Sequence, residues 1–94
     1  MIEVSKVSGI FEFTKEKNLY KVLGRAFLVE NKNTIEVRCD KKLGELLMTK
    51  YESVMRSRYF GRGGIEIVLS GQISEGEIED LIRLSYNLTK EKEE

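Results

Sequence analysis

Residues 54–69 read VMRSRYFGRGGIEIVL, and this stretch decides the fold because it joins a segment that must be buried to one that must stay exposed to solvent. In its second half Ile65, Ile67 and Leu69 recur at every other position, which is the period of a half-buried β-strand. Such a strand is buried only against a sheet and at least one helix, which the rest of the chain must supply. The first half is rich in arginine and glycine and must stay near water.

The segments before residue 54 predict further strands. Short alternating or apolar runs predict strands ending near Phe13, at residues 19–23, at 26–30 and at 34–39. The polar run 14–18 reads as a turn, and Gly24 as a bulge or a close backbone approach. Residues 31–33 read as a hairpin loop, because Asn tolerates positive φ. The alternation in 34–39 indicates one buried and one wetter face, as in an antiparallel sheet.

Two helices are expected, one short and one long. Asp40 can cap a short helix that ends near Lys50. Residues 51–55 are expected to be irregular or extended, and the glycines at 61–64 to form a tight turn before a strand at 65–70. Ser74 and Glu77 form a capping box at the start of the last helix. Apolar or small residues then recur at helical spacing, namely Ile78, Leu81, Ile82, Ser85 and Leu88.

This order of elements predicts an α+β fold, an antiparallel β-sheet with one short and one long C-terminal helix packed on one face. We expect one domain over residues 1–90 and a frayed polar tail at 91–94. The opposite face of the sheet should carry Arg38, Glu36, Glu66 and Val68, and it is either solvated or used in binding.

Composition excludes several classes of function. There is no histidine, so His-based triads and His–metal sites are impossible, and no phosphate-loop motif is present. The acids at residues 75–80 suit the first turn of a helix, where its dipole favours negative charge. We therefore expect no enzyme, no metal and no cofactor. The lone Cys39 reads as a small buried hydrophobe, and the lack of a long apolar run predicts no membrane span and a cytoplasmic protein.

The charge balance directs attention to the arginines near residue 60. Residues 1–73 hold 13 Lys/Arg against 9 Asp/Glu, whereas residues 74–94 hold 3 against 7, so the net charge of zero hides a polarised chain. Arginine forks suit phosphate, and aromatic side chains can stack on bases. A solvated loop, with Tyr59 or Phe60 in the core and the arginines paired with the acidic last helix, is the competing interpretation.

Three short segments resemble the MmcQ/YjbR-like family. Gly24-Arg25-Ala26-Phe27 before a hairpin resembles its Gly-Lys-x-Phe entry, Leu43–Tyr59 looks like its helix and the segment leading to a tyrosine, and Ile78–Leu88 is similar to its closing helix with the Ser85-Tyr86 pair. The resemblance implies a frataxin/CyaY-like fold and the DNA-binding label that the family commonly carries. Members usually open with a helix, whereas residues 1–18 are strand-like.

Our leading hypothesis is a small domain that binds DNA weakly and mostly without sequence preference. The expected contacts are Arg56, Arg58, Arg62 and Tyr59, with Arg25, Arg38, Lys41 and Lys42 as outer contacts. The alternative is a protein-interaction or self-association module, a weak homodimer for example, that uses an exposed sheet face or edge.

Overall fold

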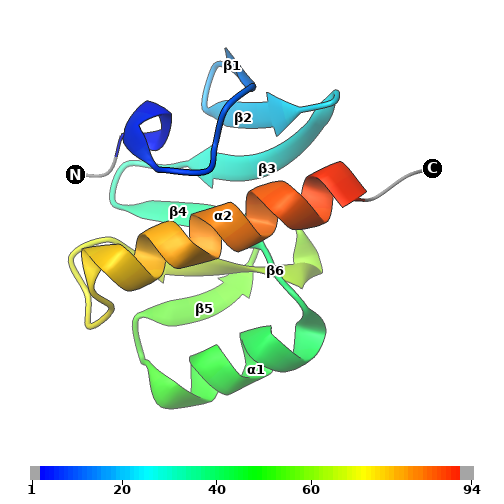
Figure 1. Cartoon of the computed structure of the whole chain (residues 1–94). Coiled ribbons are helices and arrows are strands. Elements are labelled where there is room, and N and C mark those ends of the chain that lie inside the picture. Colours follow the sequence, from blue (N-terminus) through cyan, green and yellow to red (C-terminus); the bar gives the residue numbers. More distant parts are fainter. Residues whose placement is uncertain (1–2, 92–94) are drawn as a thin grey trace.

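The computed structural model describes residues 3–91, which form one sheet covered by two helices (Figure 1). In chain order the elements are the 3₁₀ turn η1 (Val4–Lys6), β1 (Thr14–Glu16), β2 (Leu19–Val22), β3 (Arg25–Glu30), β4 (Thr34–Arg38), α1 (Lys41–Lys50), β5 (Val54–Ser57), β6 (Gly61–Val68) and α2 (Glu75–Glu91). No helix in this part of the chain is long and apolar enough to span a membrane.

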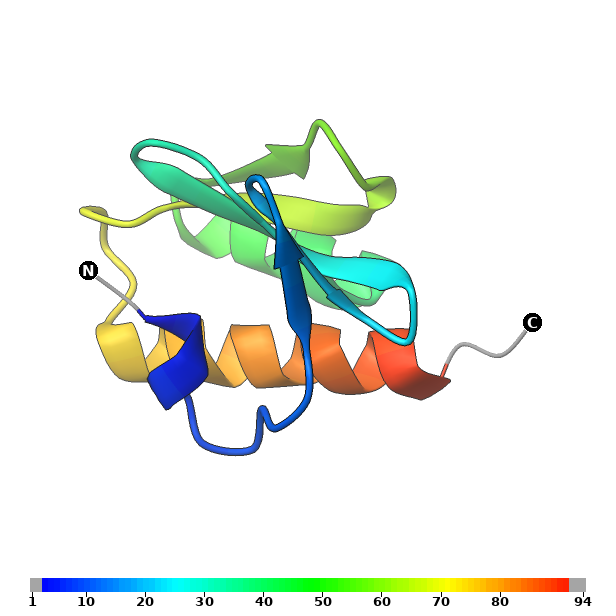
Figure 2. The ribbon, with the colours of Figure 1, turned by 90° about the horizontal axis from the view of Figure 1, so that it is seen from above.

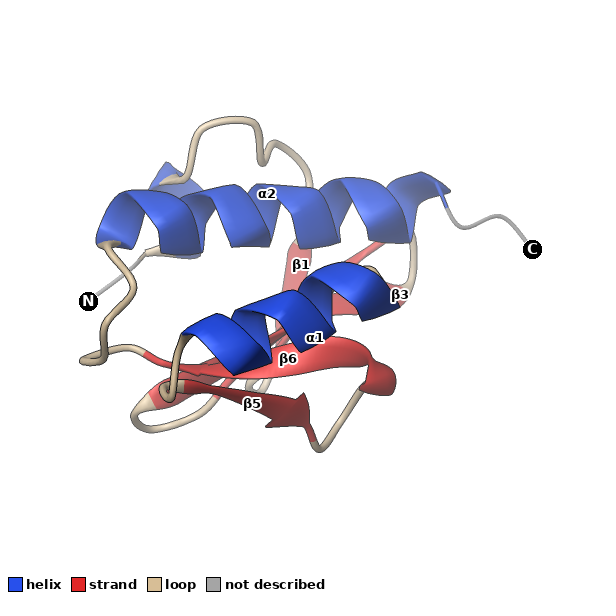
Figure 3. Ribbon diagram, turned by 90° about the horizontal axis from the view of Figure 1, so that it is seen from below, coloured by secondary structure: helices blue, strands red, loops and turns tan. Residues whose placement is uncertain are grey.

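The six strands pair antiparallel in the order β1-β2-β3-β4-β6-β5. Both helices lie on the same side of this sheet, α2 across β3 and β4 and α1 across β5 and β6 (Figures 2 and 3). The predicted α+β class, with a short and a long helix on one face, is therefore confirmed. The core between the two layers is centred on Phe27, Leu28, Ile65, Ile67 and Ile82, none of which is exposed to solvent.

Helix α1 begins and packs as its sequence allows. The Asp40 carboxylate accepts hydrogen bonds from the backbone N–H groups of Lys42 and Leu43, which confirms the predicted cap. Gly44 is the buried residue of this helix. A Cβ at Gly44 would lie 3.1 Å from Cys39 Sγ and 3.3 Å from Ile65 Cγ2, so glycine lets the helix approach the sheet closely.

Helix α2 is joined to the sheet through Ser85. Its Oγ accepts from the Arg38 N–H at 2.8 Å and donates to the Phe27 carbonyl at 2.5 Å. These two backbone groups belong to neighbouring strands, β4 and β3, near the β-bulge of β3. Ser85 therefore completes the backbone hydrogen bonding of the sheet from the helix layer.

The N-terminal segment crosses the other flank of α2. The Tyr86 hydroxyl donates to the Glu12 carbonyl at 2.9 Å and accepts from the Glu12 N–H at 3.1 Å. Arg83 also donates to the Ser8 carbonyl. The prediction of a strand ending near Phe13 is wrong, because residues 4–6 form a 3₁₀ turn and residues 10–13 are irregular, and α2 supplies the partners of the Glu12 backbone.

The first two hairpins differ from the sequence prediction. Residues 14–16 form β1, where we expected a turn, and the turn is reduced to Lys17 and Asn18. Gly24 is neither a bulge nor a close approach, since it forms the β2–β3 hairpin turn with Leu23 and nothing lies within 4 Å of its missing Cβ. The φ angles of Leu23 and Gly24 are 54° and 78°, which is typical of a two-residue type I′ turn. The hairpin between β3 and β4 is confirmed.

The stretch around residue 60 is more extended than predicted. Val54–Ser57 forms the edge strand β5, which begins inside the segment 51–55 that we expected to be irregular or extended. The glycines from Gly61 onward belong to β6, which pairs with both β4 and β5. The tight turn therefore falls earlier, over residues 58–60. Of the tail predicted at 91–94, Glu91 is the last residue of α2 and residues 92–94 lie outside the described residues.

Candidate nucleic-acid interface

The sheet face opposite the helices, called the far face below, carries two buried carboxylates at its centre. Glu36 on β4 and Glu66 on β6 are direct cross-strand partners and are only 3% and 6% exposed. We expected both residues on this face, and cross-strand partners point to the same side of a sheet. Their burial was not expected, and it arises because residues 57–60, the covering turn, fold back over the strands.

Glu36 holds the covering turn in place. Its Oε1 accepts from Ser57 Oγ at 2.7 Å and from the Tyr59 N–H at 2.9 Å, and its Oε2 accepts from Asn31 Nδ2 at 3.0 Å. Burial alone would raise the pKa of Glu36, but the donors around it hold that pKa below its ordinary value. The buried group is therefore a carboxylate that positions the turn.

Glu66 neutralises one of the predicted DNA contacts. Arg58 donates to it through Nε at 3.3 Å and through a terminal guanidinium nitrogen at 3.0 Å, and Thr34 Oγ1 donates to it at 2.7 Å. The Arg58 side chain is still 76% exposed, so its outer edge faces water. Arg58 thus pairs with a carboxylate of the sheet. The competing interpretation had paired the arginines with the acidic last helix.

The two aromatic residues of the covering turn lie outside the core between the layers. Phe60 is half-buried and packs on Gly64, where a Cβ would come within 2.7 Å of the Phe60 Cβ and 2.5 Å of the Val37 carbonyl oxygen. Tyr59 is 54% exposed and meets the Phe60 ring edge to face at 5.0 Å. The absence of a side chain at residue 64 therefore makes room for an aromatic pair on the far face.

Arg38 lies on this aromatic pair. Its guanidinium carbon is 4.8 Å from the centre of the Phe60 ring, and its Nε donates to the Ala26 carbonyl at 2.8 Å. Partial burial lowers the pKa of Arg38, and the positive charge of Arg25 adds to this lowering while Tyr59 opposes it. We call Arg25, Arg38, Tyr59 and Phe60 the Arg38 cluster. Among the described residues no carboxylate forms an ion pair with Arg38, so its charge is available to an anion.

The other predicted contacts are not brought together. Arg56 lies on the edge strand opposite Ile65, and Arg62 is exposed near the start of β6. Lys41 and Lys42 occupy the first turn of α1, in the layer on the other side of the sheet. Of the eight residues that the sequence suggested, the structure groups only Arg25, Arg38 and Tyr59, with Arg58 beside them on the covering turn.

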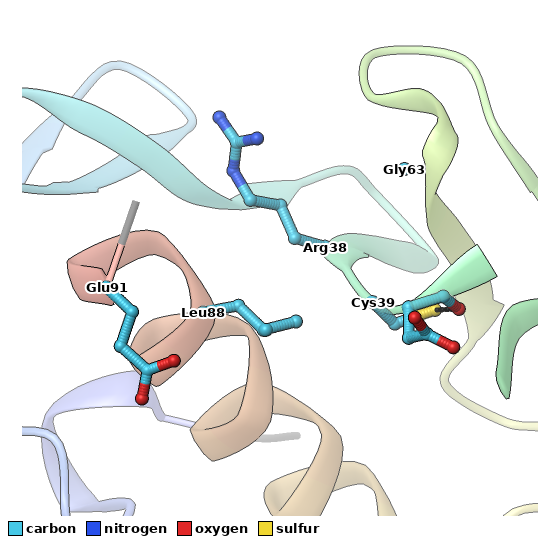
Figure 4. Close-up of a pocket in the computed structure, with 6 residues that line it drawn as sticks. Arg38, Cys39, Gly63, Leu88 and Glu91 are labelled. Carbon is cyan, nitrogen blue, oxygen red and sulfur yellow. Dashed lines mark hydrogen bonds between the residues drawn. The ribbon is translucent and has the colours of Figure 1, made fainter. Parts of the chain in front are cut away.

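A cavity of about 370 Å³ lies below Arg38, between the end of β4 and the end of α2. Its lining includes Cys39, Gly63, Leu88 and Glu91. In Figure 4 the Leu88 side chain reaches across from α2, while the Arg38 guanidinium points away from the helix. The charged end of Arg38 therefore serves the far face, and only its stem borders the cavity.

Metal-ligand groups and the single thiol are the other features of the described residues that bear on chemistry. Within residues 3–91 no three His, Cys, Asp or Glu side chains gather where they could hold a metal ion. Burial, aided by Asp40, raises the pKa of Cys39 to about 11, so its sulfur is a neutral thiol near neutral pH. Glu36 and Glu66 accept hydrogen bonds from protein donors at the distances given above.

Sequence reasoning missed the residues that organise the site. Glu36 and Glu66 were seen only as outward strand positions, and Phe60 was not included among the contacts. The signal for them was present, since both acids occupy alternating positions of strands that pair and three glycines follow Phe60. Finding them required the register between β4 and β6.

Comparison with known proteins gives one match. A sequence model of a family, described as YjbR, matches residues 4–88. No curated protein and no solved structure matches the chain. The matched range contains all three segments that carry the resemblance, as well as the Arg38 cluster and both buried carboxylates.

Proposed function

The chain belongs to the YjbR family, and from this premise we propose that it binds DNA through the Arg38 cluster on the far face of its sheet. The observation that carries the proposal is the arginine that lies on Phe60 without an ion-pair partner among the described residues. A partly desolvated guanidinium gains more from a phosphate than a fully solvated one does. Arg25 beside it adds a second charge, and the exposed Tyr59 ring offers a face for a base or sugar.

The charges support weak contact without sequence preference. Arg25 and Arg38 would each meet a phosphate, and the exposed side of Arg58 or Arg62 would add one or two more at the periphery. Three to four phosphate contacts correspond to a slope of log affinity against log salt of about −2.7 to −3.6. No helix enters a groove in this arrangement, so few base edges are read.

The test is a fluorescence titration of a labelled 20-base-pair duplex at low salt. The double variant Arg25→Gln/Arg38→Gln is compared with Lys41→Gln/Lys42→Gln, which removes the same charge from the other layer of the fold. We expect the first variant to bind about tenfold more weakly and the salt slope to flatten by about 2, and the second to bind like the unmodified protein. Tyr59→Ala should weaken binding without changing the slope.

Two results would contradict the proposal. One is a chain that binds no DNA at 20 mM salt, and the other is an equal loss of affinity in both double variants. The second result would show that total charge governs binding and that the Arg38 cluster has no special part in it. Thermal melts of each variant keep a folding defect apart from a binding defect.

The proposed function needs neither a catalytic residue nor a cofactor, in keeping with a chain that lacks histidine. It is also compatible with our expectation of a cytoplasmic protein. Self-association is a second candidate function, favoured by one specific observation in the helix layer: Leu46 is 62% exposed there. Leu46 belongs to α1, so a self-association surface around it would lie on the opposite side of the sheet from the Arg38 cluster.

A further inference from the structure

The helix layer contains two hollows, one towards each end of α2, and we call the line that they form beside α1 the groove. The two helices run in opposite directions, so the end of α1 lies near the start of α2 (Figure 1). One end of the groove is a hollow of about 160 Å³ lined by Leu43, Leu47 and Leu81, and the other is the cavity bordered by Leu88. All four leucines are only partly buried, so apolar surface remains open along the groove.

The rim of this groove is acidic on the side of α2. Glu77 and Asp80 border the hollow at the start of the helix, and Glu91 borders the cavity at its end. Asp80 is paired with Arg83, which also holds the N-terminal segment, so the rim charges without an ion pair among residues 3–91 are Glu77 and Glu91. The groove therefore suits a partner that presents apolar and positively charged side chains together.

The outer surface of α1 has that composition. Leu46 is 62% exposed, and Lys42 and Lys50 lie four residues before and after it, on the same face of the helix. Gly44 faces the sheet, so the stripe of Lys42, Leu46 and Lys50 faces solvent. Leu46 lies between the two lysines of this stripe, and nothing in the described part of the chain covers it.

We propose that the helix layer is a self-association surface, in which α1 of a second copy lies over the groove between α1 and α2. The basic stripe of one copy meets the acidic rim of the other, and Leu46 enters between the partly buried leucines. Because α1 also forms one wall of the groove, the same contact is made twice about a twofold axis.

The dimensions of the two stripes are compatible. At 1.5 Å per residue, Lys42 and Lys50 are about 12 Å apart along α1, and Glu77 and Glu91 are about 21 Å apart along α2. Extended lysine and glutamate side chains can cover the difference at each end. With one leucine anchor per copy and exposed ion pairs, the dimer belongs to the weak class and depends on salt.

Sedimentation velocity of the whole chain over a range of concentrations tests the proposal. The dimer should weaken by at least tenfold in Leu46→Lys and with rising salt. The sharpest test mixes two variants, Lys42→Glu/Lys50→Glu and Glu77→Lys/Glu91→Lys. Each variant alone places like charges in both contacts and should be monomeric, whereas the mixture places opposite charges in both contacts and should dimerise.

Several outcomes would overturn the proposal. One is a chain that stays monomeric at every concentration. Another is a Leu46→Lys variant that dimerises as well as the unmodified protein does. A third is the absence of a mixed dimer from two charge variants that both melt like the unmodified protein. A dimer that is insensitive to salt would point to a sheet edge instead. Binding of a cationic amphipathic peptide without self-association would assign the groove to a different partner. The experiment contains no DNA, so its result is independent of the proposed function.

Discussion

Glu36 and Glu66 are direct cross-strand partners on β4 and β6, and one chain of hydrogen bonds joins their carboxylates. Asn31 donates to both Glu36 and Thr34, and Thr34 donates to Glu66. Two negative charges on paired residues would normally destabilise a sheet. The covering turn compensates, because it brings the Ser57 hydroxyl and the Tyr59 N–H to Glu36 and the Arg58 guanidinium to Glu66.

Glu36→Gln tests whether this network needs its charge. At pH 7 we expect the free energy of unfolding to fall by about 2 kcal/mol, since hydrogen bonds to a charged acceptor are replaced by weaker ones. The pKa of Glu36 is lowered in the folded protein, so its contribution is complete above the unfolded value of about 4.5 and is lost as the pH falls below it. Urea unfolding at pH 7 and pH 3 should show the difference between the two proteins shrinking at the lower pH.

Glu52→Gln is a control for that measurement, because Glu52 is an exposed acid that no ion pair in the described residues engages. It should leave both the stability and its pH dependence nearly unchanged. A difference between Glu36→Gln and the unmodified protein that is the same at both pH values would contradict the charged role of Glu36.

Gly64→Ala should disrupt the far face, whereas Gly63→Ala should be tolerated. A Cβ at Gly64 meets the Val37 carbonyl oxygen at 2.5 Å and Phe60 at 2.7 Å, while a Cβ at Gly63 has no neighbour closer than 3.7 Å. We expect a loss of about 2–3 kcal/mol in the first variant and less than about 0.5 kcal/mol in the second. Chemical denaturation of both proteins side by side measures the contrast, and equal stabilities would show that Phe60 does not pack on Gly64.

The helices and the central hairpin could be predicted because their signals are local. Asp40 caps α1 through its own neighbours, and Ser74 accepts from the Glu77 N–H at 3.2 Å, which is one half of the predicted capping box. The pairing of β3 with β4 follows from alternation on both sides of a short Asn-containing loop. Each of these signals is contained within a dozen residues, so no information from elsewhere in the chain is needed.

The path of residues 10–13 and the site could not be predicted because the partners of their residues are distant in sequence. The backbone of Glu12 finds its partner in Tyr86, 74 residues away, so residues 10–13 need no strand neighbour. The arginines near residue 60 looked equivalent, but Arg56 lies on β5 opposite Ile65, whereas Arg58 lies in the covering turn and pairs with Glu66. Arg38 lies at the centre of the site because its guanidinium packs on the Phe60 ring. The two residues are 22 positions apart, so no local sequence pattern predicts this contact.

Ser85→Ala should be costly although it removes one oxygen atom. The variant leaves the Arg38 N–H and the Phe27 carbonyl without the partner that joins them in a fully buried position. We expect a loss of about 2–3 kcal/mol in the free energy of unfolding. Tyr86→Phe removes the contacts to Glu12 in a part-buried position and should cost about 1 kcal/mol. If Asn87→Ala, at an exposed neighbouring position, costs as much as Ser85→Ala, general weakening of α2 is the better explanation.

Cys39 should react with thiol reagents only when the protein opens. Burial raises the pKa of its thiol to about 11, so at pH 8 almost none of it is the reactive thiolate. Labelling with an aromatic disulfide reagent at pH 8 should be at least tenfold slower in the native protein than in urea. Gly44→Ala, which crowds the Sγ at 3.1 Å, should speed labelling by loosening α1, while Gly76→Ala, in open space on α2, should not. Rapid labelling of the native chain would contradict the burial of this thiol.

Leu23→Asn should stabilise the protein, which is unusual for the replacement of a leucine. Leu23 occupies the first position of the β2–β3 turn with φ at 54°, a conformation that costs a leucine about 1 kcal/mol and that Asn before Gly adopts readily. The side chain is 70% exposed, so little apolar burial is lost. We expect the melting temperature to rise by about 4–8 °C in calorimetry. Leu23→Ala keeps a Cβ at the same φ and should bring no such gain, so a rise in both variants, or a fall in the Asn variant, would show that the leucine side chain and not the turn controls stability here.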